Sequence, residues 1–321
     1  MRPLLDVRIG VVGSYATGLT MKVVRLPSAG ETILGSGYRV DFGGKGSNQA
    51  LGCARLGAKT SFVAKIGKDG FAEMALELYR EEGLDVRWVK QTSEAPTGIG
   101  FILVEEGSGR NCIALDPGAN EILTPADIMD CKEAFDTCGV ILTQLEIPVM
   151  TAEAALARGR SVGAITILNP APVRPLPPAL FALIDVLTPN ETEAKVLCGC
   201  SPDAAISPEQ IGRELVRKGV RQVVMTLGEN GALIVTSSSM TNIPAHRMKV
   251  VDTTGAGDAF NAGLAVALAS GENLEAAVRF GAVAGGLAVT REGVVPSLPN
   301  REEVTRFCEQ ERMAVPKWLA D

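Results

Sequence analysis

The chain has 321 residues, of which 46% are hydrophobic and 21% charged, and its formal net charge is −6. This size suits one large α/β domain, and the acidic balance excludes the basic footprint of a nucleic-acid-binding protein. Seven cysteines accompany a single histidine, so no zinc site is expected and the thiols fit a reducing cytoplasm. The apolar stretches are too short for a membrane span, and MRPLLDVRIGVVGS at the start lacks the pattern of a signal peptide.

Short β-branched runs alternate with longer amphipathic ones along most of the chain. Buried strands are predicted over 7–12, 61–66, 139–145, 164–169, 185–190 and 221–227. Helical periodicity lies between them over 46–57, 69–82, 148–159 and 207–219, and three more helices are predicted over 257–270, 272–289 and 300–312. The alternation predicts an α/β fold, with a mostly parallel sheet and helices on both of its faces.

Two Gly-rich regions, 14–45 and 96–117, show strand-like alternation without helices between the strands. We expect them to pair into a small antiparallel sheet that forms a lid over the carboxyl ends of the parallel strands, where open α/β sheets bind ligands. The alternative is a pair of ordinary hairpins packed on the core. The whole chain, 1–321, is interpreted as one domain that includes this lid.

The segment DFGGKGSNQALGCARLG (41–57) combines a glycine-rich turn with the start of a helix. Asn48, on the first helical turn, can both donate to and accept from vicinal hydroxyl groups, as sugar recognition requires. Lys45 could reach an anionic or hydroxyl-rich ligand. A plain Gly-rich turn before a helix explains the same residues, because the spacing is not that of a Walker-type phosphate loop.

Two further turns precede helices or follow strands in a way that suits a nucleotide. In LTPNETEA (187–194), Asn190 and Glu193 could hold magnesium through oxygen atoms and water, and they also have the spacing of a capping box. In TLGENGA (226–232), Thr226 and the backbone after it could contact nucleotide phosphates or ribose. A β-hairpin turn explains this second segment equally well.

The segment DTTGAGD (252–258) leads into the apolar helical run AFNAGLAVALA. Gly255, Ala256 and Gly257 have little or no side chain, so N–H groups at the start of this helix can form an anion hole for a transferring phosphoryl group. Asp258 would face the same space and take a proton from the attacking hydroxyl group. Helix capping alone needs only one aspartate, and an aspartyl-phosphate intermediate would need a surrounding motif that is absent.

These segments together resemble the ribokinase-like carbohydrate kinases, also called the phosphofructokinase-B family. The resemblance spans residues 7 to 312 and is carried by GGKGSNQA, QLEIP, LNPAP, TPNETEA, VMTLGENGA, DTTGAGDAFNAG and AVTREGVVPSLP in that order. Ribokinase and deoxyribokinase are the most similar branches. The resemblance implies a three-layer sandwich with a β-sheet lid, a homodimer formed through the lid, and magnesium-dependent transfer of the γ-phosphoryl group of ATP to a sugar hydroxymethyl group.

The resemblance also implies roles for individual residues. Asp258 matches the catalytic base, and Gly255, Ala256 and Gly257 match the anion hole. The sugar-contact positions are Gly44, Lys45, Asn48 and Glu146; the magnesium-associated motif is Asn190 and Glu193; the ATP-binding positions are Asn190, Thr226, Gly228, Gly231 and Gly257. The loops that hold an activating potassium ion are matched at Asp252, Thr254, Ala288, Arg291, Gly293 and Ser297.

One segment departs from the family pattern. Ribokinases carry a GSxNxD-like segment whose Asn and Asp bind sugar hydroxyl groups from the lid, whereas GSYATG (13–18) places Ala16 and Gly18 there. Loss of that carboxylate should weaken sugar binding by ~1.5–3 kcal/mol for each charged hydrogen bond. Either Tyr15 or Thr17 substitutes, or the substrate is not free ribose; a larger sugar, or one without those hydroxyl groups, would fit the space beside Gly18.

Two other functions are compatible with the same pattern. A nucleoside kinase uses the same core with a base under the lid, although aromatic residues make up only 4% of the chain. A sugar-sensing binding protein without turnover would explain the altered GSYATG segment, but not the intact Asp258 and anion hole.

Overall fold

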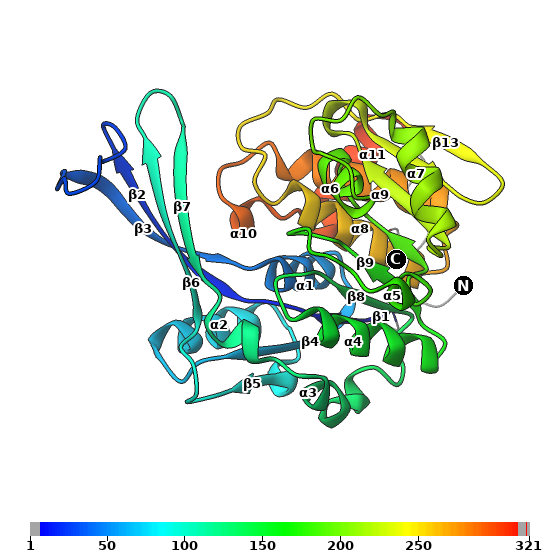
Figure 1. Cartoon of the computed structure of the whole chain (residues 1–321), viewed down its shortest axis with the longest axis horizontal. Coiled ribbons are helices and arrows are strands. Elements are labelled where there is room, and N and C mark those ends of the chain that lie inside the picture. The colour runs from blue at the N-terminus through cyan, green and yellow to red at the C-terminus, as the bar shows by residue number, and fades with distance from the viewer. Residues whose placement is uncertain (1–6, 314–318, 320–321) are drawn as a thin grey trace.

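The computed structural model describes residues 7–313 and 319, so the ends of the predicted 1–321 domain lie outside the described residues (Figure 1). A nine-stranded sheet crosses the molecule in the order β13-β12-β11-β10-β9-β8-β1-β4-β5. Its strands are β1 (Arg8–Val12), β4 (Lys59–Ile66), β5 (Val89–Gln91), β8 (Val140–Thr143), β9 (Ile165–Leu168), β10 (Val186–Leu187), β11 (Gln222–Thr226), β12 (Ala232–Val235) and β13 (Met240–Ile243). The pairs from β5 to β11 are parallel, and only β12 and β13 are antiparallel. The predicted parallel sheet is confirmed.

Helices cover both faces of this sheet, because its strands are apolar on both sides. One core contains Ile9 and Val11 of β1 with residues of α1, α2, α8, α9 and α11, and the other contains Val12 with residues of α3 to α7. The helices are α1 (Lys45–Arg55), α2 (Gly70–Glu81), α3 (Pro125–Asp130), α4 (Val149–Ser161), α5 (Pro178–Phe181), α6 (Glu191–Leu197), α7 (Pro208–Arg217), α8 (Ala256–Ala269), α9 (Leu274–Ala288), α10 (Val294–Ser297) and α11 (Arg301–Gln310). The three-layer sandwich is therefore confirmed, and none of the described helices is long and apolar enough to cross a membrane.

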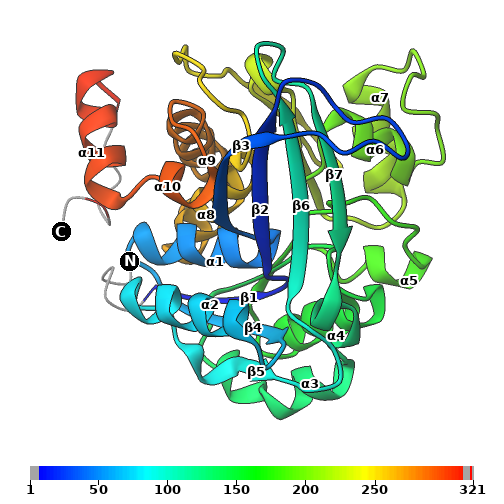
Figure 2. The same ribbon diagram turned by 90° about the vertical axis from the view of Figure 1, so that its left-hand side faces the viewer.

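Four strands form a separate sheet that projects from the body as a lid (Figures 1 and 2). They are β2 (Ala16–Val23), β3 (Gly35–Gly43), β6 (Gly98–Glu105) and β7 (Asn111–Asp116), in the order β3-β2-β6-β7. Both predicted lid regions thus contribute, but the prediction of an antiparallel sheet was wrong at its centre, where β2 pairs with β6 in parallel. The chain leaves the lid after β3, builds α1 to β5 in the body and then re-enters, and this long connection allows β6 to run in the same direction as β2.

Candidate active site

The site is built where two helices begin under the lid. Gly44, with φ of 89°, lies between β3 and α1, and a Cβ atom there would lie 2.6 Å from the Cα atom of Tyr15. Only glycine combines that left-handed conformation with so close a contact. Gly255, with φ of 83°, precedes α8 in the same way, and its Cβ would lie 2.6 Å from Val294 Cγ1. The two glycines let these chain segments approach closely as α1 and α8 begin.

Asp258 lies on the first turn of α8 and is only 5% exposed. The amide of Asn48 donates to its Oδ2 atom at 2.8 Å, and the amide of Gln49 donates to its Oδ1 atom at 2.9 Å. Burial raises the pKa of the Asp258 carboxyl group above its ordinary value, while the Lys45 ammonium group and the two amides oppose that rise. A buried carboxylate held by two amide donors is well suited to accept a proton.

A chain of amides fixes Gln49 in turn. Gln144 Nε2 donates to Gln49 Oε1 at 2.6 Å, so the Nε2 group of Gln49 is left to face Asp258 and the Oδ1 atom of Asn169 at 3.1 Å. The sequence motifs GGKGSNQA, QLEIP and LNPAP contain these three residues, but no role was predicted for their side chains. The motifs could therefore have pointed to these side chains, but the contacts among them could be found only from the structure.

Asn48 carries an unused acceptor. Its Nδ2 group is engaged by Asp258, whereas its buried Oδ1 atom has no hydrogen-bond partner among the described residues. A buried carbonyl oxygen without a donor costs free energy, so this atom is poised for a hydroxyl group of a ligand. This observation supports the predicted sugar contact of Asn48.

Lys45 and Glu146 lie beside Asp258. Although burial opposes it, the carboxylates of Asp258, Glu146 and Glu193 raise the pKa of Lys45 above its ordinary value, so the side chain carries a positive charge. Glu146 Oε2 accepts from Ser14 Oγ at 2.5 Å and from the backbone N–H of Lys45 at 2.8 Å. Glu146 therefore holds the start of α1 against the end of β1, in addition to its predicted sugar contact.

The predicted anion hole has two free donors. The N–H of Ala256 donates to the Thr253 carbonyl oxygen at 3.3 Å, and the first bond of α8 runs from Ala259 to Gly255. The N–H groups of Gly257 and Asp258 have no acceptor within the part of the chain that the structure describes, and a Cβ on Gly257 would meet no atom within 4 Å. The open space and the free donors coincide at Gly257, next to Asp258.

The segments predicted to bind ATP and magnesium are adjacent. The N–H of Thr226 donates to Pro189 O at 2.9 Å, which joins the end of β11 to the start of α6. Asn190 and Glu193 form a capping box, in which Glu193 Oε2 accepts from Asn190 N at 2.9 Å. Burial raises the pKa of Glu193, and no described residue donates a hydrogen bond to its Oε1 atom, so capping leaves one carboxylate oxygen for a cation or its water.

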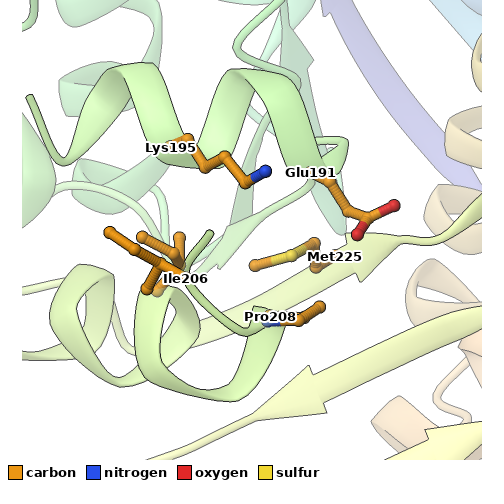
Figure 3. A pocket seen from close by; sticks show the side chains of 6 residues that line it. Glu191, Lys195, Ile206, Pro208 and Met225 are labelled. Carbon is orange, nitrogen blue, oxygen red and sulfur yellow. The ribbon is translucent and has the colours of Figure 1, made fainter. Parts of the chain in front are cut away.

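The turn after β11 also depends on glycine. Gly228 has φ of 57° and Gly231 has φ of 90°, and a Cβ on Gly231 would lie 2.0 Å from the Ile243 carbonyl oxygen. A pocket of about 440 Å³ adjoins this turn, and Leu227 and Asn230 are among the residues that line it. A smaller pocket between α6 and α7 is lined by Glu191, Lys195, Ile206, Pro208, Ile211 and Met225 (Figure 3). None of the predicted site residues lines either pocket.

The two loops predicted to hold potassium meet each other. Asp252 Oδ1 accepts from Thr254 N at 2.9 Å, and Asp252 Oδ2 accepts from Gly293 N at 3.1 Å. The side chains of the other predicted residues are engaged elsewhere, since Arg291 pairs with Glu303 and Ser297 donates to Val294 O. A potassium ion at this junction would therefore depend on backbone carbonyl groups rather than on these side chains.

Tyr15 and Thr17, the two suggested substitutes for the lost sugar-binding side chains, do not face the site. Both are fully buried, and the Tyr15 hydroxyl group lies 3.0 Å from Thr17 Oγ1. The Tyr15 ring packs edge-on against Tyr79 at 6.0 Å between centroids, and burial raises the pKa of Tyr15 to about 12. Side chains alternate along a strand, so Tyr15 and Thr17 point to the face opposite Ala16 and Gly18.

Comparison with known proteins gives consistent results. Residues 8–301 match the family described as pfkB family carbohydrate kinase. The chain is 35% identical to a ribokinase of Haemophilus influenzae over 299 residues, covering 93% of this chain and 97% of the relative. It is 33% identical to a deoxyribokinase of Salmonella typhi over 300 residues, covering 93% and 98%.

Solved structures have the same fold. A ribokinase from Thermotoga maritima superposes with a TM-score of 0.87 at 36% identity, over 94% of this chain and 99% of that one. Arabidopsis thaliana ribokinase, complexed with ribose and ATP, superposes with a TM-score of 0.87 at 32% identity, over 95% and 98%.

Proposed function

Because this chain belongs to the pfkB family of carbohydrate kinases, and is thus an ATP-dependent carbohydrate kinase, we propose that it phosphorylates the hydroxymethyl group of ribose, deoxyribose or a related sugar. The observation that carries the proposal is the position of Asp258. Its buried carboxylate and the free N–H groups of Gly257 and Asp258 lie on the same first turn of α8. A proton acceptor and an anion site are thereby joined in one helix start.

In the proposed mechanism the sugar binds with its hydroxymethyl group at Asp258. The Oδ1 atom of Asn48 accepts a hydrogen bond from another hydroxyl group of the sugar, which orients the ring. As the hydroxymethyl oxygen attacks the γ-phosphorus atom of ATP, its proton passes to Asp258 and the bond from phosphorus to the bridging oxygen of ADP breaks. The N–H groups of α8 and the Lys45 ammonium group stabilise the negative charge on the transferring group. The transfer is direct and in line, without a covalent enzyme intermediate.

The remaining site residues are assigned to ATP and cations. We place the ATP phosphates against Gly257, Asn190, Thr226, Gly228 and Gly231. Glu193, with its free Oε1 atom, and Asn190 fit a water-coordinated magnesium ion, which when bound neutralises phosphate charge. The junction of Asp252 and Gly293 fits an activating potassium ion held by backbone carbonyl groups.

We also propose that the lid forms a homodimer. Its strands and the β2–β3 connection expose apolar side chains that lie more than half accessible in the single chain: Leu34, Tyr38, Phe101, Ile113 and Leu115. The strand register puts Phe101 on the face opposite Ile113 and Leu115, so apolar side chains are exposed on both faces of the lid, where a second copy of the chain can cover them. Light scattering of the purified protein should give twice the mass of the chain; a monomeric mass over the whole concentration range would refute the dimer.

The function is tested by incubating the protein with ATP, magnesium and potassium and a panel of pentoses, deoxyribose, ketohexoses, nucleosides and sugar acids. ADP release is measured, and the phosphate ester is located by NMR. Turnover of a sugar with the ester on a hydroxymethyl oxygen is expected. Turnover of nucleosides alone would make the protein a nucleoside kinase, and binding of sugars without turnover would make it a sensor.

A further inference from the structure

We propose that Asp41, on strand β3 of the lid, is a specificity-determining residue whose carboxylate accepts hydrogen bonds from the sugar hydroxyl groups remote from the transferred phosphoryl group. The substrate class that this selects is a neutral sugar with hydroxyl groups at that end. The inference rests on the proposed kinase function and concerns how the same site recognises its substrate.

The first observation is the pairing of Asp41 with Gly18. The two residues are opposite each other in the antiparallel register of β2 and β3. A Cβ atom on Gly18 would lie 3.5 Å from Asp41 Cβ and 3.3 Å from Ile102 Cδ1. Gly18 does not have a positive φ, so its backbone conformation does not require glycine. The absence of a side chain at position 18 therefore leaves the space beside it to the Asp41 carboxylate.

The second observation is that the Asp41 carboxylate is held by one oxygen only. Thr20 Oγ1 donates to Oδ2 at 2.9 Å, and Arg39 Nε donates to the same atom at 2.8 Å. No donor to Oδ1 is found among residues 7–313 and 319, and the side chain of Asp41 is 36% exposed. The carboxylate is thus fixed in orientation while its second oxygen is open to a ligand.

The third observation is the direction in which this face of the lid points. Gly18, Thr20, Arg39 and Asp41 share one face of the sheet, because alternate residues of a strand lie on the same side. Arg39 Nη1 donates to Glu292 Oε1 at 2.7 Å, in the loop just before α10, which lies near β3 in Figure 1. In the same loop the N–H of Gly293 donates to Asp252, and Val294, the first residue of α10, packs against Gly255. The face that carries Asp41 is therefore turned toward the start of α8.

Asp41 is also close to the site along the chain. Asp41 precedes Gly44 by three residues of nearly extended chain, which corresponds to ~10 Å at ~3.3 Å per residue. Gly44 is the residue from which α1 starts, and α1 carries Asn48 beside Asp258. Asp41 therefore lies on the lid strand that leads directly into the helix beside Asp258.

The charges around Asp41 favour a neutral sugar. Arg39 is the positive group nearest to Asp41, and both Asp41 and Glu292 already pair with it. Lys45 is likewise surrounded by Asp258, Glu146 and Glu193. Lys22, two residues beyond Thr20 on β2, helps Arg39 to lower the pKa of Glu292, so its charge also acts on an acidic group. A sugar acid or a sugar phosphate would bring a further negative charge beside Asp41 and Glu292, where like charges repel.

The test compares steady-state kinetics of the wild type, Asp41→Asn, Thr20→Val and Glu292→Gln with D-ribose, 2-deoxy-D-ribose, D-fructose and D-xylose. For the best of these substrates, Asp41→Asn should raise the sugar KM by about 10- to 150-fold, the range of a lost charged hydrogen bond, with the ATP KM and kcat within about threefold. Thr20→Val, which loosens the carboxylate, should raise the sugar KM by about 2- to 13-fold. Glu292→Gln is the matched control, since it removes the other partner of Arg39 and leaves Asp41 in place.

The outcomes separate the two proposals. A sugar KM within twofold of the wild type in a folded Asp41→Asn protein, or an equal loss in Glu292→Gln, would overturn the role of Asp41 while the kinase function stands. An inactive wild type with every sugar would instead refute the proposed function, and the role of Asp41 with it. Thermal unfolding of each variant, with and without ATP, shows whether the variant is folded.

Discussion

Replacing Gln49 with methionine should move the pH dependence of the reaction in a predictable direction. Methionine keeps the unbranched shape of glutamine but cannot donate to Asp258 Oδ1, a bond of 2.9 Å in a buried site. A hydrogen bond to a charged group contributes about 1.5–3 kcal/mol, and 1.36 kcal/mol corresponds to one pKa unit. The pKa of Asp258, already raised by burial, should therefore rise by about one to two further units.

The sign of the effect follows from the role of the carboxylate. The proposed base must be ionised, so kcat/KM falls as the pH drops below the pKa of Asp258. A higher pKa in Gln49→Met moves this acidic limb to higher pH, and the loss of activity shrinks as the pH is raised. The assay is kcat/KM against pH, measured for the wild type and the variant in the same buffers.

Gln144→Met provides the comparison. It removes the donor to Gln49 Oε1 at 2.6 Å but leaves the contact between Gln49 and Asp258 in place, so a smaller shift of the acidic limb is expected. Both substitutions remove one buried amide, and similar losses of thermal stability are expected from them. An unchanged limb in Gln49→Met, or a loss of activity equal at every pH, would refute the view that Gln49 acts through the ionisation of Asp258.

Two further substitutions test the loops around this centre. Gly255→Ala should lower the free energy of unfolding by at least ~1–2 kcal/mol, because alanine is unfavourable at φ of 83° and its Cβ atom would meet Val294; it should also lower kcat. The control is Gly271→Ala, where φ is 91° and a Cβ atom would meet no atom within 4 Å. It should show only the conformational cost in thermal unfolding and keep the wild-type kcat. Equal kcat in the two variants would contradict the assigned anion hole. Glu193→Gln should raise the magnesium concentration needed for half-maximal velocity by roughly tenfold, in line with one lost charged contact. The same substitution at the exposed neighbour, Glu191→Gln, should leave that concentration unchanged. Identical magnesium titrations of the two variants would remove Glu193 from the cation site.

Much of the architecture followed from local sequence patterns. The runs 7–12 and 221–227 are apolar on both faces, which is the pattern of central parallel strands, and they form β1 and β11. Within the segment 185–190 only Val186–Leu187 forms a strand, because Pro189 and the cap of α6 end it, and Asn190 then makes an isolated bridge to Thr226. The direction of β6 could not be predicted, since pairing between distant segments depends on tertiary contacts that local periodicity does not encode.

The candidate site was likewise predicted only in part. DTTGAGD predicted a helix start with an acid on its first turn, because small residues between two aspartates favour both a close backbone approach and a capped helix, and α8 begins there. The donors to Asp258 come from α1, far away in sequence, so Gln49 was not predicted. Asp41 was missed for a related reason: its position beside Gly18 is a matter of strand register, and register depends on how β2 and β3 pair.

The central claim is that Asp258 removes the proton from the sugar hydroxyl group that attacks ATP, and Asp258→Asn tests it most directly. Asparagine is nearly the same size and removes a buried charge, but its NH2 group cannot accept a hydrogen bond, so one of the two bonds from Asn48 and Gln49 is lost. Thermal unfolding, with and without ATP, is therefore measured to show that the variant is folded. With the best sugar substrate, kcat should fall by ~10²–10⁴, the range expected for loss of a general base. A folded Asp258→Asn protein with a near-normal kcat would contradict the account.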